Sequence, residues 1–92
     1  MYVIKYTSKY KKDYKRIKSD DRLKKKINEL VRLLSESDNL LPEKYRDHQL
    51  KGEFANFREC HILPDWLLVY KKTKKSLILL LVSTGSHSHI FN

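Results

Sequence analysis

Apolar and polar residues follow two different periods along the N-terminal third of the chain. Residues 2–6 alternate between the two kinds, which predicts a strand. After them, apolar residues recur every three or four positions, which predicts two consecutive amphipathic helices. The apolar positions of the first helix are Tyr10, Tyr14 and Ile17, and those of the second are Leu23, Ile27, Leu30, Val31 and Leu34. Thr7 or Ser8 can cap the first helix, and residues 19–21 (Ser-Asp-Asp) end it and cap the second.

The second half of the chain carries three strand-like segments separated by turn signals. They span residues 54–63, 66–72 and 76–83. Pro64 and Asp65 separate the first two segments, and two lysines occupy the next turn. Because short turns require neighbouring strands to run in opposite directions, these strands are expected to pair antiparallel. The last segment is a run of Leu and Ile, which predicts burial on both faces and a central place in the sheet.

The order of these elements predicts the fold class. One strand, two helices and three strands favour an α+β fold, in which a curved antiparallel sheet has the two N-terminal helices packed on one face. The 92 residues fit a single domain that covers positions 1–92. Residues 35–50 are polar and irregular, which predicts a long loop, and long loops in small domains often carry function. The sheet face opposite the helices would remain open to a ligand.

Charge and cysteine content narrow the class of partner. Lysine and arginine outnumber the acidic residues by 20 to 11, so the net charge is +9. A surface this basic favours a nucleic acid, the ribosome, an anionic membrane or an acidic protein, although it can also be inert. The longest apolar run, residues 77–82, is far shorter than the roughly 20 residues that span a bilayer, so no membrane partner is expected. Cys60 is the only cysteine, which favours a reducing cytoplasm and a buried filler rather than a nucleophile.

Histidines are the residues with the most informative positions. The long loop holds one, the end of a predicted strand holds another, and two follow the last strand: His48, His61, His87 and His89. Rigid scaffolds often place active sites at strand ends and in loops. In the strand at 54–63, Phe57, Glu59 and His61 share one face, and Asp65 follows in the turn. A histidine and a carboxylate on one face form a possible acid–base set.

RNA cleavage needs little more than such a set. The 2′-hydroxyl must lose a proton as it attacks phosphorus, and the leaving 5′-oxygen must gain one. Histidine titrates near neutrality and can serve either step, and a nearby cation can stabilise the charged intermediate. No metal or other cofactor is required. Three histidines and an aspartate could instead bind zinc, but no closely spaced histidine pair favours that alternative.

Three segments resemble one known family along the whole chain. Residues 41–48 (LPEKYRDH) resemble the segment before its first active-site histidine. Residues 58–70 (RECHILPDWLLVY) are similar to its central motif with Pro-Asp-Trp, and residues 84–91 (TGSHSHIF) are similar to its C-terminal signature. The family is the YafQ branch of the RelE toxin superfamily.

The resemblance implies a fold like that of small microbial ribonucleases and a ribosome-dependent messenger-RNA endonuclease in the cytoplasm. The implied partners are the 70S ribosome with its message and a cognate acidic antitoxin of the DinJ or RelB kind. Operator DNA would be bound only through the antitoxin complex. The motif match implies that the functional residues are His48, His61, Asp65, His87 and Phe91.

The roles implied by the resemblance are specific. His48 is expected as general base and His87 as general acid, or the reverse, with His61 and Asp65 orienting groups and stabilising charge. Phe91 would stack on a base of the codon or close the core. Trp66 and Arg58 complete the expected substrate-binding set, although the start of a strand also suits a core residue at 66. His89 is expected to be a surface residue.

Two other interpretations remain open. The same superfamily fold serves toxins that inhibit gyrase, but these generally lack this histidine set. A basic protein without catalytic activity could also bind RNA or a protein partner. Substitution of one histidine would separate a nuclease from both, because a nuclease would lose activity and keep its fold.

Overall fold

A five-stranded sheet forms the centre of the structure, a computed structural model that describes residues 1–17, 19–38 and 41–91. The strands lie in the order β1-β5-β4-β3-β2. They are β1 (Val3–Tyr6), β2 (His48–Gln49), β3 (Arg58–Leu63), β4 (Trp66–Thr73) and β5 (Ile78–Gly85). The helices are α1 (Ser8–Arg16), α2 (Asp21–Glu36) and α3 (His87–Phe91), with short 3₁₀ helices η1 (Glu43–Tyr45) and η2 (Gly52–Phe54).

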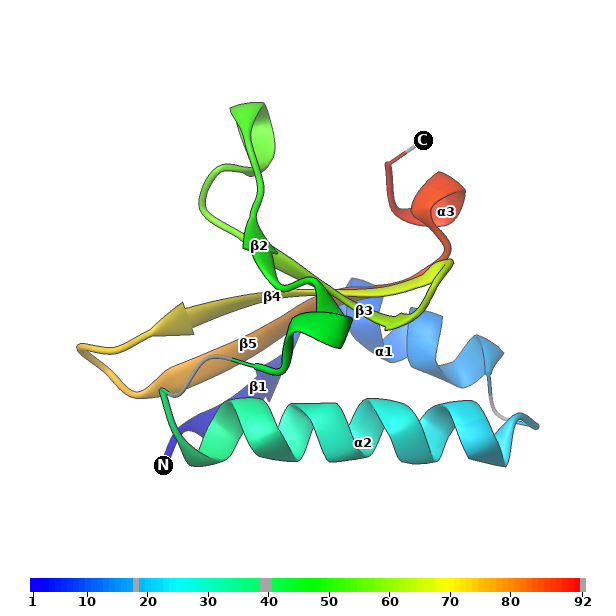
Figure 1. The fold of residues 1–92 in the computed structure, drawn as a ribbon, viewed down its shortest axis with the longest axis horizontal. Helices are drawn as coiled ribbons and strands as arrows, with labels where there is room; N and C mark the ends of the chain where they lie inside the picture. The colour runs from blue at the N-terminus through cyan, green and yellow to red at the C-terminus, as the bar shows by residue number, and fades with distance from the viewer. Residues whose placement is uncertain (18, 39–40, 92) are drawn as a thin grey trace.

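Helices α1 and α2 lie on one side of the sheet, and α3 and the segment from β2 to η2 rise on the other (Figure 1). The α+β class and the two N-terminal helices on one face are therefore confirmed. The predicted caps are also present, because the Thr7 side chain accepts a hydrogen bond from the Tyr10 amide and Asp20 accepts one from the Leu23 amide. None of the helices formed by the described residues has the length and hydropathy of a membrane span.

The two predicted apolar stripes form one side of the core. Of their residues, only Tyr14 is partly exposed, whereas Ile27 and Leu30 are almost completely buried. The sheet supplies the opposing side chains, which are Cys60, Ile62, Leu68, Tyr70, Leu79 and Leu81. Cys60 is confirmed as a buried filler, and burial raises the pKa of its thiol. A protonated, inaccessible thiol is a poor nucleophile.

The sheet differs from the prediction in the direction of its first strand. β1 pairs parallel with β5, so the sheet is mixed, whereas β2 to β5 pair antiparallel as expected. No short turn joins β1 to β5, and the rule that forces antiparallel pairing does not apply to them. The last strand, β5, lies between β1 and β4, so its predicted place inside the sheet is confirmed. β4 lies in the middle of the five strands, and its residues Leu67 to Tyr70 are all buried.

Short elements replace two segments for which no regular structure was predicted. Residues 35–50 contain the end of α2, then η1 and β2, and α3 forms within residues 86–92. The strand predicted at 54–63 begins only at Arg58, because η2 and a turn occupy the residues before it. β5 begins at Ile78 because Leu77, with a φ of 53°, still belongs to the turn. Elements this short complete too few periods to show in a hydrophobic pattern.

Asp13 fastens α1 to the sheet. Its carboxylate is almost fully buried and accepts hydrogen bonds from the Ser83 hydroxyl at 2.9 Å and the Thr84 amide at 3.2 Å. Lys9 and His89 lie at 3.3 and 2.8 Å from the same carboxylate. Burial alone would raise the pKa of Asp13, but these hydrogen bonds outweigh it and hold that pKa below its usual value. Asp13 is therefore ionised in the folded protein at neutral pH.

We expect Asp13→Asn to lower the free energy of unfolding by about 2–3 kcal/mol at pH 7, because charge-assisted hydrogen bonds to a buried group are lost. The lowered pKa of Asp13 stabilises the fold fully above its unfolded value, about 3.9, and this contribution disappears as pH falls through the folded value. Denaturant titrations at pH 7 and pH 3 give the free energy of unfolding of the unchanged protein and of Asp13→Asn. A difference in the free energy of unfolding between the two proteins that is as large at pH 3 as at pH 7 would contradict this account.

Candidate active site

Two histidines meet at a buried carboxylate on the sheet face opposite α1 and α2. His48 on β2 pairs across the strands with Glu59 on β3, and His61 lies two residues further along β3. Glu59 Oε1 is 3.8 Å from His48 Nε2 and 3.5 Å from His61 Nε2, and the two imidazole rings are 6.5 Å apart. Glu59 is buried, whereas half of the His48 side chain is exposed. The prediction that Glu59 and His61 share a face is confirmed.

The hydrogen bonds of the two rings differ. His48 Nδ1 lies 2.8 Å from the Arg46 carbonyl oxygen, which can only accept, so Nδ1 carries the proton. In the neutral ring, Nε2 then has the free lone pair and can take up a proton. Among the described residues, His61 Nδ1 is buried and has no hydrogen-bond partner. Leaving such an atom unpaired costs about 1–3 kcal/mol, which is more readily explained at a site that binds a polar ligand.

Asp47 holds the segment that carries His48. Its Oδ1 accepts hydrogen bonds from the Tyr70 hydroxyl at 2.7 Å and from Arg58 Nε at 3.2 Å. Burial raises the pKa of Tyr70, and the hydrogen bond to Asp47 raises it further. Arg58, expected to contact substrate, thus already has a protein partner and can offer only its remaining donors. Sequence reasoning missed Asp47 and Tyr70, which lie 23 positions apart.

A second group of side chains lies at α3. The exposed His87 ring is 4.9 Å from the ring of Phe91, one turn later, and Phe91 in turn meets Phe54 of η2 edge-on at 5.4 Å. The Asp65 carboxylate contacts the backbone amide of His87, at 3.4 Å, and not its imidazole. Asp65 therefore contacts the start of α3 through the backbone. Sequence reasoning missed Phe54.

The strand pairing gives the separation between the His48–His61 group and the group at α3. On three neighbouring strands, His61 pairs with Leu67 and Leu67 pairs with Gly85, the residue just before α3 begins. Two strand spacings correspond to about 10 Å. The contact between Phe54 and Phe91 joins the segment after β2 to α3 above this face.

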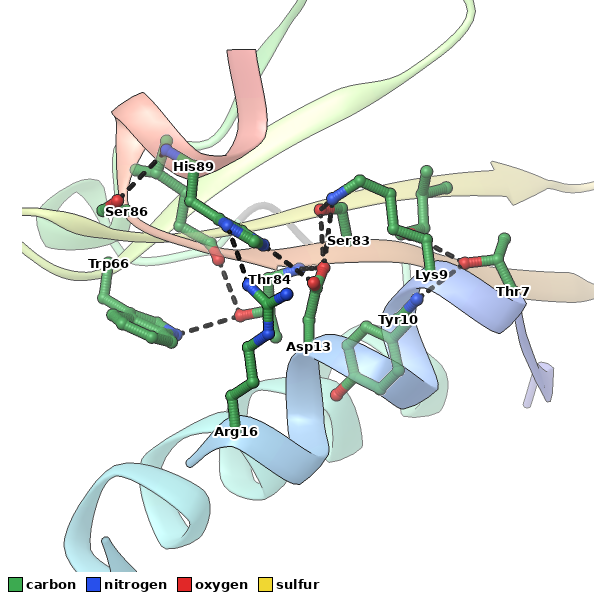
Figure 2. Close-up of polar contacts among 12 residues, drawn as sticks. Thr7, Lys9, Tyr10, Asp13, Arg16, Trp66, Ser83, Thr84, Ser86 and His89 are labelled. Atoms are coloured by element: carbon green, nitrogen blue, oxygen red, sulfur yellow. Dashed lines mark hydrogen bonds and ion pairs between the residues drawn. The ribbon is translucent and has the colours of Figure 1, made fainter. Parts of the chain in front are cut away.

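Trp66 and His89 lie beside α1 (Figure 2). The Trp66 ring packs against the core, and its Nε1 donates to the Thr84 hydroxyl at 3.0 Å. His89 was expected to be a surface residue, and its side chain is partly exposed. Its ring contacts the buried Asp13, because α3 turns the side chain at 89 toward α1 and away from the side of His87.

Comparisons with known proteins agree on one family. The family model described as "Bacterial toxin of type II toxin-antitoxin system, YafQ" matches residues 2–92. The mRNA interferase toxin YafQ of Escherichia coli K12 is 36% identical over 88 residues, which cover 96% of this chain and 94% of that protein. The crystal structure of YafQ from E. coli BL21(DE3) superimposes with a TM-score of 0.89 at 30% identity, with full coverage of both chains. A crystal structure of the E. coli DinJ-YafQ complex gives 0.88 at 32% identity, also with full coverage of both chains.

Proposed function

Because the chain belongs to the YafQ family of toxins from bacterial type II toxin–antitoxin systems, we propose that it cleaves messenger RNA in the ribosomal A site without a metal, by acid–base catalysis on histidine. Its curated relatives are named mRNA interferases. The observation that carries the proposal is that His48 on β2 and His87 on α3 lie over the same face of the sheet. The contact between Phe54 and Phe91 joins the segment after His48 to α3.

The proposed reaction moves two protons. His48 Nε2 removes the proton of the 2′-hydroxyl, whose oxygen attacks the neighbouring phosphorus. The bond to the 5′-oxygen breaks, and His87 donates a proton to that oxygen. The products are a 2′,3′-cyclic phosphate and a 5′-hydroxyl. The hydrogen bond from His48 Nδ1 to the Arg46 carbonyl supports this direction, because it leaves Nε2 free to accept.

Other groups orient the reactants and stabilise charge. His61, next to Glu59, would contribute positive charge near the phosphate, and Glu59 would stabilise that charge. Arg58, paired with Asp47, can offer its remaining guanidinium donors to a phosphate. Asp65 orients His87 through the backbone at the start of α3, and Phe91 offers its exposed portion to a base. Trp66 supports this side of the site from the core.

The proposed partners follow from charge and family. Exposed lysines on α1 and α2, namely Lys11, Lys12, Lys15, Lys25 and Lys26, face away from the sheet and suit a phosphate-rich surface such as ribosomal RNA. A further lysine between the two helices, Lys18, lies outside the described residues. By analogy with the DinJ-YafQ complexes, a cognate acidic antitoxin would neutralise the toxin, and operator DNA would be bound through that complex. The proposed location is the cytoplasm.

Cleavage should depend on the ribosome. We expect message held in the A site to be cut at least about 10²-fold faster than the same message free in solution, because the ribosome fixes its backbone for in-line attack. The measurement is the rate of cleavage of one labelled message, with and without initiated ribosomes. Equal rates would indicate a ribosome-independent nuclease, and no cleavage of either would favour a basic protein that binds without catalysis.

A further inference from the structure

His89 connects α3 to α1, as Figure 2 shows. Its Nε2 lies 2.8 Å from Asp13 Oδ1, and its Nδ1 lies 3.2 Å from a guanidinium nitrogen of Arg16. Asp13 is itself fixed to β5 by Ser83 and the Thr84 amide. A continuous line of hydrogen bonds therefore runs from the sheet through Asp13 to α3.

The two partners of His89 select one state of its ring. A guanidinium can only donate, so Nδ1 must accept from Arg16. An ionised carboxylate can only accept, so Nε2 must donate to Asp13. Both bonds exist together only in the neutral tautomer that carries its proton on Nε2. Rotation of the ring by half a turn would break both of them.

Packing holds one edge of the ring, and a cavity lies beside it. One edge of the ring lies against Gly85, where an added Cβ would come within 2.7 Å of His89 Cδ2. Beside the ring lies a cavity of about 190 Å³ that Arg16 and Trp66 also line. A side chain that lost its hydrogen bonds would have room to move into this space.

We propose that His89 is a positioning residue, which holds α3 through Asp13 so that His87 and Phe91 keep their places over the sheet. This inference rests on the proposed function. α3 has only five residues, and a helix so short does not persist without tertiary contacts. Asp65 reaches only the first residue of α3 and at 3.4 Å, so the contact of His89 with Asp13 is the shorter connection.

The test compares His89→Leu with His89→Gln. Leucine removes both hydrogen bonds, whereas the glutamine amide offers one donor to Asp13 and one acceptor to Arg16. We expect leucine to lower the single-turnover rate on saturating ribosomes about 10- to 100-fold with ribosome affinity unchanged, since misplaced catalytic groups lose that much. Glutamine should restore most of the rate.

The matched control is Ser83→Ala, which removes another hydrogen bond to Asp13 without touching α3. ¹⁵N relaxation of residues 87–91 should show increased motion for leucine at 89 and little change for alanine at 83. Equal rates per folded molecule in the two variants, or an ordered α3 without His89, would overturn the positioning role. His87→Gln in the same assay tests the proposed function separately, because activity that survives it would refute the catalytic role of His87 and leave the relaxation result valid.

Discussion

Cleavage of ribosome-bound message is expected to fall by at least about 10²-fold in His48→Ala and equally in His87→Ala, the loss typical of a missing general base or acid. His48 is half exposed and His87 is exposed, so neither ring is needed for the core. Truncation should leave the fold intact. The measurement is the single-turnover rate at saturating ribosomes, with circular dichroism and thermal unfolding of each variant.

The combined variant sharpens this expectation. If the two proton transfers by His48 and His87 occur in one concerted step, the double variant should be little slower than the slower single variant, because groups that act as a unit are not additive. Glu29→Gln changes an exposed side chain of α2 on the other side of the sheet and serves as the control. Full activity in both single variants would exclude the catalytic assignment, and unfolding of both would mean that these residues are structural.

Periodicity was enough to predict the scaffold of the site. The apolar stripes of α1 and α2 and the antiparallel pairing of β3, β4 and β5 follow from local patterns and short turns. Alternation along β3 also placed Glu59 and His61 on one face. Local rules could reach these features because each depends on residues that are close in the sequence.

Contacts between distant segments could not be predicted in this way. His48 meets Glu59 only because a two-residue strand, β2, pairs with β3, and two residues show no period. His89 lies 76 positions from Asp13, and their pairing depends on how α3 turns over Gly85. The same limit applies to Asp47, whose partners Arg58 and Tyr70 lie on two different strands. Polar contacts of this kind, rather than hydrophobic patterns, position the candidate catalytic side chains.

The largest expected effect comes from a change in the substrate. A 2′-deoxy nucleotide at the cut position should abolish cleavage, because the proposed nucleophile is its 2′-hydroxyl and no other group in the mechanism can replace it. The chemical groups at the ends of the products also identify the nucleophile. An intact site should yield a 2′,3′-cyclic phosphate and a 5′-hydroxyl, which mass spectrometry of the fragments identifies.

The control is a 2′-deoxy substitution one nucleotide downstream of the cut, which leaves the nucleophile in place and changes the sugar by the same single atom. We expect that message to be cut at nearly the normal rate. Cleavage of the message that lacks the hydroxyl at the cut position, or a 5′-phosphate product, would identify water as the nucleophile. His48 would then have to activate a water molecule, and the free lone pair that its bond to the Arg46 carbonyl leaves on Nε2 would serve hydrolysis instead.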